Sequence, residues 1–499
     1  MTDEQKNINP FEEYTIRCQK LEKIKELNID PYPSERIEYL SNNQLVANFN
    51  EYLEQKKSVT IVGRLRSKRW HGGSCFANLE NNWQQIQIYF KKDEVGKADY
   101  EIFVDLLDVG DIIQISGEPF LTKRGEKTIL VKKYHLLNKS LLPLPEKWHG
   151  LSDIETRFRQ RYLDLIANNE VKDIFLKRQA IINYLRNYLD NQSFMEVDTP
   201  ILQSLAGGAI AEPFVTHHRA LDIDLFLRIA PEIFLKKLII GGFTKIYEVA
   251  RCFRNEGIDH AHNPEFTQIE LYWAYQDYLG LMDFTEQMIS QLVWEINGSF
   301  LVNYDGHDYN FQPPWPRIDY REELIKRCKV DINNYPTAYE LKPLAIKLGI
   351  AVADEWGKGK IIDELYKKYV RNEIPGPFYI VNHPIELSPL AKKNKKEPNF
   401  VDRFQLVVAG FELVNAFSEL NDSFDQAERF VEQQRLKDEG DQEAVPYDAE
   451  YVEALKYGLP PTAGLGLGID RLVQILTNQH NIKNVIFFPT LKPKLEDKK

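Results

Sequence analysis

The alternation of apolar and polar positions predicts two antiparallel strands between residues 245 and 275. One set of side chains in the second strand is Thr267, Ile269, Leu271, Trp273 and Tyr275, and the other is Phe266, Gln268, Glu270 and Tyr272. Because successive side chains point to opposite faces, each set shares one surface. The segment 245–253 is also β-prone and pairs with the second strand. The connection 255–264 is too long for a tight hairpin and is rich in charged, His and Asn residues, and connections of this length are usually functional or disordered.

Two helical patterns precede the first β-rich segment. Apolar residues lie near helical spacing over 11–29, a break follows at 30–34, and a second helical piece covers roughly 42–57. Three interpretations of this N-terminal arm remain open. It packs on the next domain, lies along a nucleic acid, or stays a solvated helical arm.

Short β runs bounded by Gly, Asn and Asp fill residues 59–142 and predict five strands. A small closed barrel of the OB-fold type is the natural candidate. Arg64, Arg66 and Lys68 alternate along the first strand, Arg69 follows, and no acidic residue interrupts them. A basic strand beside exposed aromatics is how such barrels bind single-stranded nucleic acid. Phe76, taken alone, is interpreted more readily as a core residue of the barrel.

The larger C-terminal part begins with a hinge at 143–166, where two prolines mark a boundary. An amphipathic helix over 173–190 leads into a short strand that ends at Pro200. Two strands surround a turn at Ala409 and Gly410. Gly464, Gly466 and Gly468 predict a glycine-rich turn that opens into a helix from Ile469, which alone is weak evidence for phosphate binding. Residues of about 276–395 are predicted to form an insertion that decorates a sheet.

Composition narrows the class of protein. The 499 residues, 43% hydrophobic and 12% aromatic, are those of a globular chain of two or three domains. A net charge of −11 argues against indiscriminate nucleic-acid binding and confines contact with RNA to local basic patches. The four cysteines are scattered without metal-binding spacing, and neither a signal peptide nor a bilayer-spanning run is present. We expect a soluble cytoplasmic protein with no membrane or DNA partner.

Three motifs carry a specific resemblance. FRNEG at 253–257 followed by HNPEFT at 262–267 resembles motif 2 of class II aminoacyl-tRNA synthetases. GLGLGIDRL at 464–472 looks like motif 3, and the helix, strand and Pro200 at 173–200 resemble motif 1. The P-loop and the HIGH and KMSKS signatures of class I enzymes are absent. Across 11–495 the pattern resembles the lysyl-tRNA synthetases of subclass IIb.

The resemblance implies an α+β fold: a short N-terminal helical arm at 1–57, an all-β OB-fold anticodon-binding domain at 58–145, and an antiparallel-sheet catalytic domain at 146–499. In that family motif 1 builds a homodimer interface, although an internal helix packed on a sheet would produce the same pattern. RSKRWHGGSCF followed by IQIY resembles the anticodon barrel of the family. This implies that Phe76 stacks a base and that Arg69 and Gln87 bind base edges of tRNA(Lys). Gly73 departs from the family, which usually has Lys there.

The implied reaction joins L-lysine to ATP, giving lysyl-adenylate, and then transfers lysine to the terminal ribose of tRNA. The attacking carboxylate is already ionised, so the site must supply alignment and positive charge rather than a general base. Arg254 and Arg471 fit that role. Phe266 would stack under adenine with Arg471 on its other face. The remaining ATP-binding residues implied by the resemblance are Glu256, His262, Asn263, Glu412 and Gly468.

Amino-acid recognition is implied by three glutamates. The family pattern assigns Glu419 and Tyr272 to the ε-ammonium of lysine, and Glu232 and Glu270, with the Gly208 backbone, to its α-amino group. Asn415 and Phe417 line the side-chain slot. A further buried carboxylate requires a second cation on the substrate, which lysine provides. Aspartyl and asparaginyl enzymes share the architecture but need a cation or an amide donor in this place.

The Mg²⁺ ligands show one departure. Lysyl enzymes usually place two glutamates on the Mg²⁺ ions between ATP phosphates, whereas this chain has Glu412 and Gln405. A neutral amide oxygen exerts less electrostatic pull, so we predict an active enzyme that needs more Mg²⁺ than a Glu-containing relative.

Two alternative functions remain open. The first is a ligase that modifies a protein instead of tRNA, against which the barrel counts. The second is an RNA-binding relative that has lost activation. Gln405 and Glu212, which stands where the family has a basic residue, favour it, while Arg254, Arg471 and the three glutamates oppose it.

Overall fold

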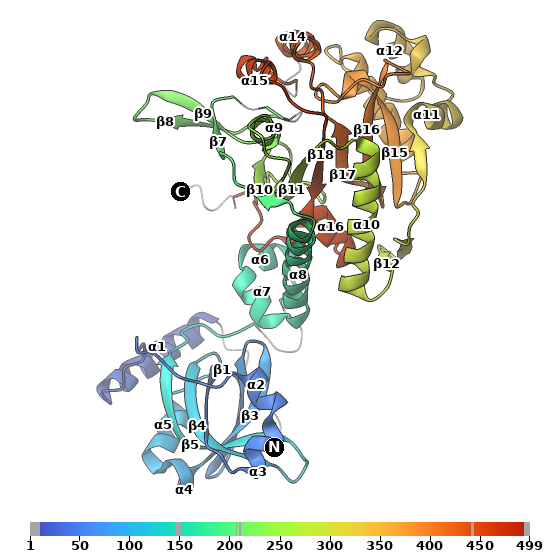
Figure 1. Ribbon diagram of the computed structural model, residues 1–499. Coiled ribbons are helices and arrows are strands. Elements are labelled where there is room, and N and C mark those ends of the chain that lie inside the picture. The colour runs from blue at the N-terminus through green and yellow to red at the C-terminus, as the bar shows by residue number, and fades with distance from the viewer. Residues whose placement is uncertain (1–9, 146–150, 206, 209–210, 441–443, 494–499) are drawn as a thin grey trace. The chain divides into compact units, whose positions relative to one another are not determined.

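A computed structural model describes residues 10–145, 151–205, 207–208, 211–440 and 444–493 (Figure 1). Its internal contacts divide the chain into two compact units, Met1–Asn169 and Glu170–Lys499. This division falls later than the boundary expected after residue 145, because two short helices, α6 (Ile154–Arg159) and α7 (Arg161–Ala167), group with the N-terminal part. Each unit is described by itself below.

The N-terminal unit contains the closed five-stranded barrel that the β-rich pattern predicts. Its strand order is β1-β2-β3-β5-β4, and β1 closes the barrel by antiparallel pairing with β4. Buried and partly exposed positions alternate along β1 to β3, so one face of each strand fills the interior. The strands are β1 (Val59–His71), β2 (Ser74–Asn81), β3 (Gln84–Lys91), β4 (Ile112–Leu121) and β5 (Lys127–Asn138), and helices α4 (Lys92–Val95) and α5 (Lys97–Asp105) lie between β3 and β4.

The N-terminal helices pack on this barrel. They are α1 (Pro10–Glu26), α2 (Asn42–Ala47) and α3 (Phe49–Glu54). Ile24, Leu45 and Phe49 are fully buried in the same apolar cluster as the barrel interior. Arg17 of α1 donates to the backbone oxygens of Val109, at 3.1 Å, and of Ser140 and Leu142, both at 3.3 Å. Of the interpretations of the arm, packing on the next domain is therefore confirmed, and a solvated arm is wrong.

The C-terminal unit is built on an eight-stranded sheet of order β14-β15-β16-β17-β18-β11-β10-β6. All neighbouring strands are antiparallel except β14–β15 and β10–β6. The α+β class and the pair formed by 245–253 with the following strand are confirmed. The strands are β14 (Arg317–Asp319), β15 (Phe378–Pro384), β16 (Phe400–Val408), β17 (Phe411–Ser418), β18 (Thr462–Gly468), β11 (Glu265–Ala274), β10 (Lys245–Phe253) and β6 (Met195–Glu196).

Helices cover one face of the central strands. Helices α8 (Asn169–Asn191), α10 (Tyr278–Asn297) and α16 (Ile469–Leu476) share a core with β11 and β18. Ile269 and Leu271 of β11, together with Leu465 and Leu467 of β18, point into that core. Alternation therefore directs the polar positions of β11 to the opposite face, as the sequence predicts. A second cluster forms around α9 (Glu232–Ile240), α14 (Ser423–Asp438) and α15 (Ala449–Leu455).

The segment of about 276–395 differs from the expected insertion. Its first helix, α10, lies in the main core, and its strands β14 and β15 belong to the eight-stranded sheet. A subsidiary core gathers α11 (Tyr320–Cys328), α12 (Ala338–Lys347) and α13 (Lys358–Tyr366) against β15. The remaining strands are β7 (Leu202–Gln203), β8 (Val215–His218), β9 (Ile223–Leu227), β12 (Leu301–Tyr304) and β13 (His307–Asn310). The chain also forms short helical segments of about one turn: η1 (Ile332–Asn334), η2 (Lys367–Arg371), η3 (Ile385–Leu387) and η4 (Ile482–Val485).

The glycine-rich segment before α16 also differs from its prediction. Gly464, Gly466 and Gly468 do not form a turn but lie in β18, which pairs with β11 on one side and β17 on the other. Glycine frequency favours a turn, but here two neighbouring strands supply the backbone partners. Among the described residues, no helix combines the length and apolar character needed to cross a membrane.

Candidate active site

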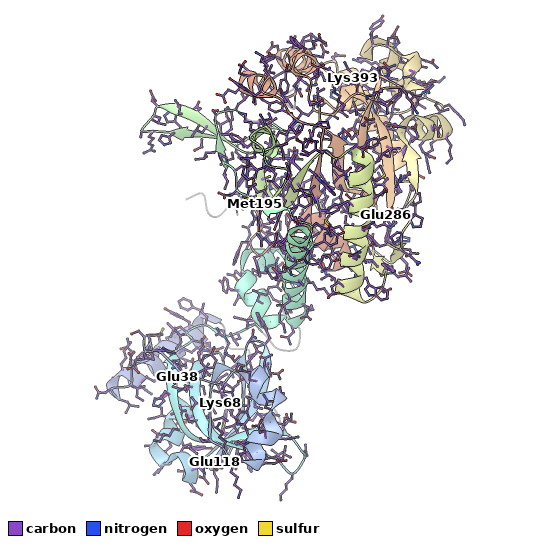
Figure 2. All side chains as sticks on the ribbon, in the orientation of Figure 1. Glu38, Lys68, Glu118, Met195, Glu286 and Lys393 are labelled. Carbon is purple, nitrogen blue, oxygen red and sulfur yellow. The ribbon has the colours of Figure 1, made fainter. Side chains whose placement is uncertain are left out.

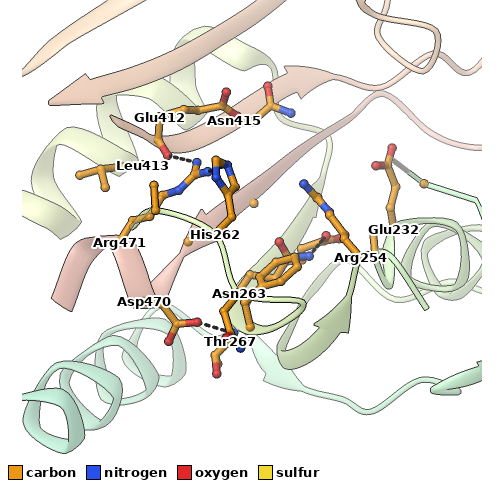
Figure 3. A pocket seen from close by; sticks show the side chains of 18 of the residues that line it. Glu232, Arg254, His262, Asn263, Thr267, Glu412, Leu413, Asn415, Asp470 and Arg471 are labelled. Atoms are coloured by element: carbon orange, nitrogen blue, oxygen red, sulfur yellow. Dashed lines mark hydrogen bonds between the residues drawn. The ribbon is translucent and has the colours of Figure 1, made fainter. Parts of the chain in front are cut away.

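A deep pocket lies over the glycine face of β18, between β17 and β11 (Figure 3). It holds about 1070 Å³ of empty space, part of it open to solvent, which is enough for a nucleotide together with a small ligand. Glu419 and Gln405 lie just outside the lining and contact it. The expected residues that line it are Gly208, Glu232, Arg254, Glu256, His262, Asn263, Phe266, Glu270, Tyr272, Glu412, Asn415, Phe417, Gly468 and Arg471.

One end of the pocket gathers buried carboxylates. Glu232, Glu270 and Glu419 are each less than a tenth exposed. Glu270 accepts hydrogen bonds from Nε2 of Gln268 at 2.6 Å and from Oη of Tyr272 at 3.3 Å. Burial, together with the charges of neighbouring glutamates, raises the pKa of Glu270 well above its ordinary value. Burial therefore disfavours the ionised form of this carboxyl group unless a cation lies beside it.

Lys236 connects two of these carboxylates. Its fully buried Nζ lies 2.5 Å from Oε1 of Glu232, one turn earlier in α9, and 2.5 Å from Oε2 of Glu419. Burial alone lowers the pKa of a lysine, but the two carboxylates raise that of Lys236 above its ordinary value. Burial raises the pKa of Glu419 to about 8, although Lys236 opposes the shift. The contact to Glu419 is an ion pair without hydrogen-bond alignment, and Oε1 of Glu419 has no hydrogen-bond partner among the described residues.

Two glycines, Gly464 and Gly208, have no side chain and so leave room for the side chains of the acidic end. A Cβ on Gly464 would lie 2.1 Å from Oε1 of Glu419 and 2.6 Å from Cε1 of Tyr272. Gly208 has φ +89°, and a Cβ there would lie 3.1 Å from Cβ of Glu232. Larger residues at either position would therefore displace the acidic end of the pocket or strain its backbone.

The other end of the pocket presents cationic and aromatic groups. Cζ of Arg254 lies 5.0 Å from the ring centroid of Phe266. Nη1 of Arg471 donates to the backbone oxygen of Glu412 at 3.0 Å, and its Nη2 lies 3.1 Å from Nε2 of His262 (Figure 3). The guanidinium of Arg254 thus contacts the Phe266 ring. Two guanidinium groups and an imidazole suit the binding of phosphate oxygens.

A polar network fixes the strands and helix behind these groups. Oδ2 of Asp470 accepts a hydrogen bond from the backbone nitrogen of Thr267 at 2.8 Å, and its Oδ1 pairs with Arg178 of α8. Arg178 also donates to Oγ1 of Thr267 at 3.1 Å. Asp470 precedes Arg471 directly, so the network sets the position at which the arginine enters the pocket.

Gln405 and Glu412 form one pair at the pocket edge. Nε2 of Gln405 donates to Oε2 of Glu412 at 2.9 Å. Among the described residues, no group of three or more His, Cys, Asp and Glu side chains is placed to hold a metal ion by itself. The carboxylate and the amide oxygen are nevertheless the hard donors that Mg²⁺ prefers. Any metal bound here would take its other ligands from a substrate and from water.

In the N-terminal unit, the expected anticodon residues lie on adjacent strands. Arg69 pairs in register with Phe76, and Phe76 with Tyr89. Phe76 is half-buried and stacks on Tyr89 with ring centroids 4.4 Å apart, so it lies outside the barrel core. Arg69 is exposed, and Oε1 of Gln87 accepts a hydrogen bond from Oγ1 of Thr128 at 2.9 Å. The three residues therefore border one outer face.

The other basic residues of β1 have internal partners. Lys68 lies in the barrel unit (Figure 2). Its Nζ donates to the backbone oxygens of Phe103, Val104 and Leu107 at 2.6–2.8 Å. Burial lowers the pKa of Lys68 to about 8. Arg64 donates to the oxygen of Gly110, and Arg66 lies 3.5 Å from the carboxylate of Glu80. The side chains of Arg64, Arg66 and Lys68 thus have partners within the barrel unit, and of the four basic residues Arg69 is the exposed one.

Comparison with known proteins accounts for this geometry. The family described as tRNA synthetases class II (D, K and N) matches residues 153–492, which is more than half of the chain. The chain belongs to the class II tRNA synthetases. A second family model, described as an OB-fold nucleic acid binding domain, matches residues 59–137 and coincides with the barrel of this synthetase.

Curated relatives of the synthetase match it along nearly its whole length. It is 45% identical to the lysine–tRNA ligase of Syntrophomonas wolfei over 99% of both chains. It is 47% identical to the lysine–tRNA ligase of Thermoanaerobacter pseudethanolicus over 96% of both chains. It is 46% identical to that of Moorella thermoacetica, over 96% of this chain and 98% of the relative.

Sequence reasoning located most of the synthetase pocket but missed its supporting charges. Lys236, Arg178 and Asp470 were not among the expected residues. Lys236 contacts the expected Glu232 and Glu419, whereas Arg178 and Asp470 contact each other and Thr267. The i, i+4 spacing of Glu232 and Lys236 was the one local signal that could have identified Lys236. Arg178 and Asp470 are 292 positions apart, and no local pattern relates them. Glu212, where a basic residue was expected, accepts a hydrogen bond from Nδ2 of Asn255 at 3.2 Å.

Proposed function

We propose that this synthetase is a lysine–tRNA ligase, which activates L-lysine with ATP and transfers it to the 3′ end of tRNA(Lys). The observation that carries the proposal is the buried carboxylate of Glu419, whose Oε1, beside Gly464, has no hydrogen-bond partner in the part of the chain that the structure describes. Because Lys236 pairs with Oε2, Oε1 remains available for a cation that the substrate brings. The full-length similarity to curated lysine–tRNA ligases supports the same reaction.

The acidic end of the pocket would hold lysine by its two ammonium groups. Glu419 and the phenol of Tyr272 would receive the ε-ammonium, while Glu232, Glu270 and the Gly208 backbone would receive the α-ammonium. Asn415 and Phe417 would line the side chain between them. The lysine carboxylate would then face the cationic end of the pocket, where Arg254 lines the wall.

The cationic end would bind ATP and stabilise the reacting phosphate. Arg254 and Arg471 would neutralise the pentavalent α-phosphorus centre, whose charge increases in the transition state. His262, which contacts Arg471, would bind the phosphate chain with Glu256, Asn263 and the Gly468 backbone. For Phe266 to stack on adenine, the guanidinium of Arg254 would turn from the ring toward the α-phosphate. No general base is needed, because the lysine carboxylate is ionised at neutral pH.

Glu412 and Gln405 would hold Mg²⁺ together with ATP phosphates. The ion would supply positive charge between the phosphates and favour the departure of pyrophosphate. Glu412 would contribute the anionic ligand, and its backbone oxygen also positions Arg471. This residue therefore links the Mg²⁺ ion to the guanidinium of Arg471.

Three further features complete the proposal. The outer face of the barrel at Arg69, Phe76 and Gln87 would bind the anticodon of tRNA(Lys). Exposed apolar side chains at Leu176, Met195 and Ile201 suit a homodimer interface in the motif 1 region, which sedimentation velocity would test. We place the enzyme in the cytoplasm, where tRNA is charged.

The test is ATP–pyrophosphate exchange with lysine, aspartate and asparagine in parallel at several Mg²⁺ concentrations, followed by charging of tRNA(Lys). We expect exchange with lysine alone and lysine-dependent charging. Exchange with aspartate or asparagine would show that the pocket recognises that amino acid instead of lysine. Exchange with none of the three at any Mg²⁺ concentration would leave an RNA-binding relative that has lost activation.

A further inference from the structure

The acidic end of the pocket contains a cation of its own. Nζ of Lys236 lies 2.5 Å from one oxygen of Glu232 and 2.5 Å from one oxygen of Glu419. It is fully buried, between the rings of Phe417 at 5.4 Å and Tyr451 at 5.8 Å. The ammonium therefore has no access to water, and its charge interacts with the two carboxylates at low screening.

Charged groups from three segments of the chain lie around this lysine. Helix α9 supplies Glu232 and Lys236, the segment after β17 supplies Glu419, and β11 supplies Glu270. Tyr272 and Tyr451 face the same group as neutral phenols, because burial raises the pKa of both. Glu248 of β10 lies near Glu270 but is neutralised by Arg228 at 2.5 Å. When the three carboxylates are ionised beside bound ammonium groups, they and the ammonium group of Lys236 together carry two negative charges.

Two negative charges balance the two positive charges of lysine, one on its α-ammonium group and one on its ε-ammonium group. Without Lys236, three buried carboxylates would face two ammonium groups, and one carboxylate would stay unpaired or bind a proton. Lys236 also occupies Oε2 of Glu419, which leaves Oε1 for the ligand.

We propose that Lys236 is a specificity-determining positioning residue: an internal ammonium that bridges Glu232 and Glu419 and sets the amino-acid pocket to accept a dication. The inference rests on the proposed function, since it concerns how the pocket selects lysine. If Lys236 only packed the core, its substitution would act through side-chain volume, whereas the proposed role acts through charge. Substitutions that restore the net charge of the pocket separate these two roles.

The experiment compares three variants of the full chain: Lys236→Met, which keeps the side-chain length, Glu232→Gln, and the double variant. Lys236→Met leaves one negative charge too many and Glu232→Gln one too few, while the double variant restores two. We expect each single substitution to raise the Kd and the KM for lysine about tenfold or more. The double variant is expected to bind lysine more tightly than either single variant, and the KM for ATP is expected to stay within about twofold throughout.

Lysine binding is measured by calorimetry and lysine KM by ATP–pyrophosphate exchange, with circular dichroism as the check of folding. A lysine Kd for Lys236→Met within twofold of the wild type would overturn the inference. A double variant that binds lysine more weakly than both single variants would overturn it as well, since additive losses indicate packing. If Lys236→Met does not fold, the comparison of Glu232→Gln with the double variant decides by itself. Absence of lysine-dependent exchange in the wild type would instead contradict the proposed function.

Discussion

Burial disfavours the ionised forms of the Glu270 and Glu419 carboxyl groups, although Lys236 lies beside Glu419. Burial raises the pKa of Glu419 to about 8 and that of Glu270 well above its ordinary value. The groups facing them are Lys236, Glu232, Glu248, Tyr272 and Tyr451. Ammonium groups of a bound lysine would stabilise the ionised forms, so binding and deprotonation are coupled.

We therefore predict that lysine binding releases protons near neutral pH. Since the free pocket holds protons that the complex does not, lysine affinity is expected to rise from pH 6 to about 8, where Glu419 ionises unaided. Calorimetry in two buffers of different ionisation enthalpy measures the number released. Glu419→Gln is the matched variant and should release about one proton fewer. Proton uptake on binding, or an affinity independent of pH, would contradict this coupling.

Gln405 reduces the negative charge at the edge of the nucleotide site. It donates to Glu412 at 2.9 Å, whereas a glutamate there would place a second carboxylate beside the first. We predict that Gln405→Glu lowers the Mg²⁺ concentration for half-maximal ATP–pyrophosphate exchange severalfold, because two carboxylates attract the ion more strongly. Gln312→Glu, at an exposed position outside the pocket, adds the same charge as a control. An unchanged Mg²⁺ dependence in Gln405→Glu would disprove the role of this residue.

At the scale of elements, β18 determines the depth of the pocket. It carries glycine at alternate positions on the face that looks toward Tyr272 and Phe417, and leucine on the face that enters the core. The strand therefore seals the core on one side and leaves open space on the other. A helix or a turn could not separate the two faces in this way, because only a strand has a period of two.

Gly464→Ala tests this arrangement. The added methyl carbon would lie 2.1 Å from Oε1 of Glu419, so we predict a rise of about tenfold or more in lysine KM with an unchanged KM for ATP. Gly466→Ala is the matched control, because its Cβ would meet nothing closer than Cγ of Glu270 at 3.8 Å. Equal effects of the two substitutions on lysine KM would show that the close approach at Gly464 is unimportant.

How far the sequence predicted these elements depends on the range of the interactions. The alternation along β11 placed Phe266, Gln268, Glu270 and Tyr272 correctly on one face, because the period of a strand is a local property. The strand character of 464–468 was missed, because it depends on pairing with β11 and β17 from elsewhere in the chain. The boundaries of the expected insertion failed for the same reason. β14 is three residues long and is recognisable only by its pairing with β15.

The candidate site residues also divide by whether their roles depend on local sequence or on distant contacts. Motif-like segments identified the groups that would touch substrates, since those residues cluster along short stretches. Lys236, Arg178 and Asp470 act through partners far away in the sequence, and their roles depend on tertiary contacts. For Arg64, Arg66 and Lys68, charge pattern alone suggested a binding surface, whereas their carbonyl and carboxylate partners come from other parts of the barrel unit.

At the scale of the whole molecule, two compact units divide the proposed work. The barrel unit carries the surface at Arg69, Phe76 and Gln87, and the larger unit carries the pocket. Activation of lysine uses only the pocket, whereas charging of tRNA uses both. Substitutions in the barrel should therefore affect the second step selectively.

We predict that Phe76→Ala raises the KM for tRNA(Lys) in aminoacylation about tenfold or more, since stacking of one base on an aromatic ring contributes roughly 1–3 kcal/mol. ATP–pyrophosphate exchange should keep its wild-type rate and lysine KM. Trp83→Ala, an exposed aromatic in the loop between β2 and β3, is the matched control. A parallel loss of exchange in Phe76→Ala would show that the barrel substitution acts on the catalytic unit.

The most direct test of the account compares lysine with norleucine, which has the same chain without the ε-ammonium group, in ATP–pyrophosphate exchange. If Glu419 is the buried partner of that group, norleucine leaves Oε1 of Glu419 without a partner, and a site built for a polar partner rejects such analogues by factors of about 10⁴. We predict that kcat/KM for norleucine lies at least about a thousandfold below that for lysine. A norleucine value within about tenfold of that for lysine would contradict recognition of lysine by charge.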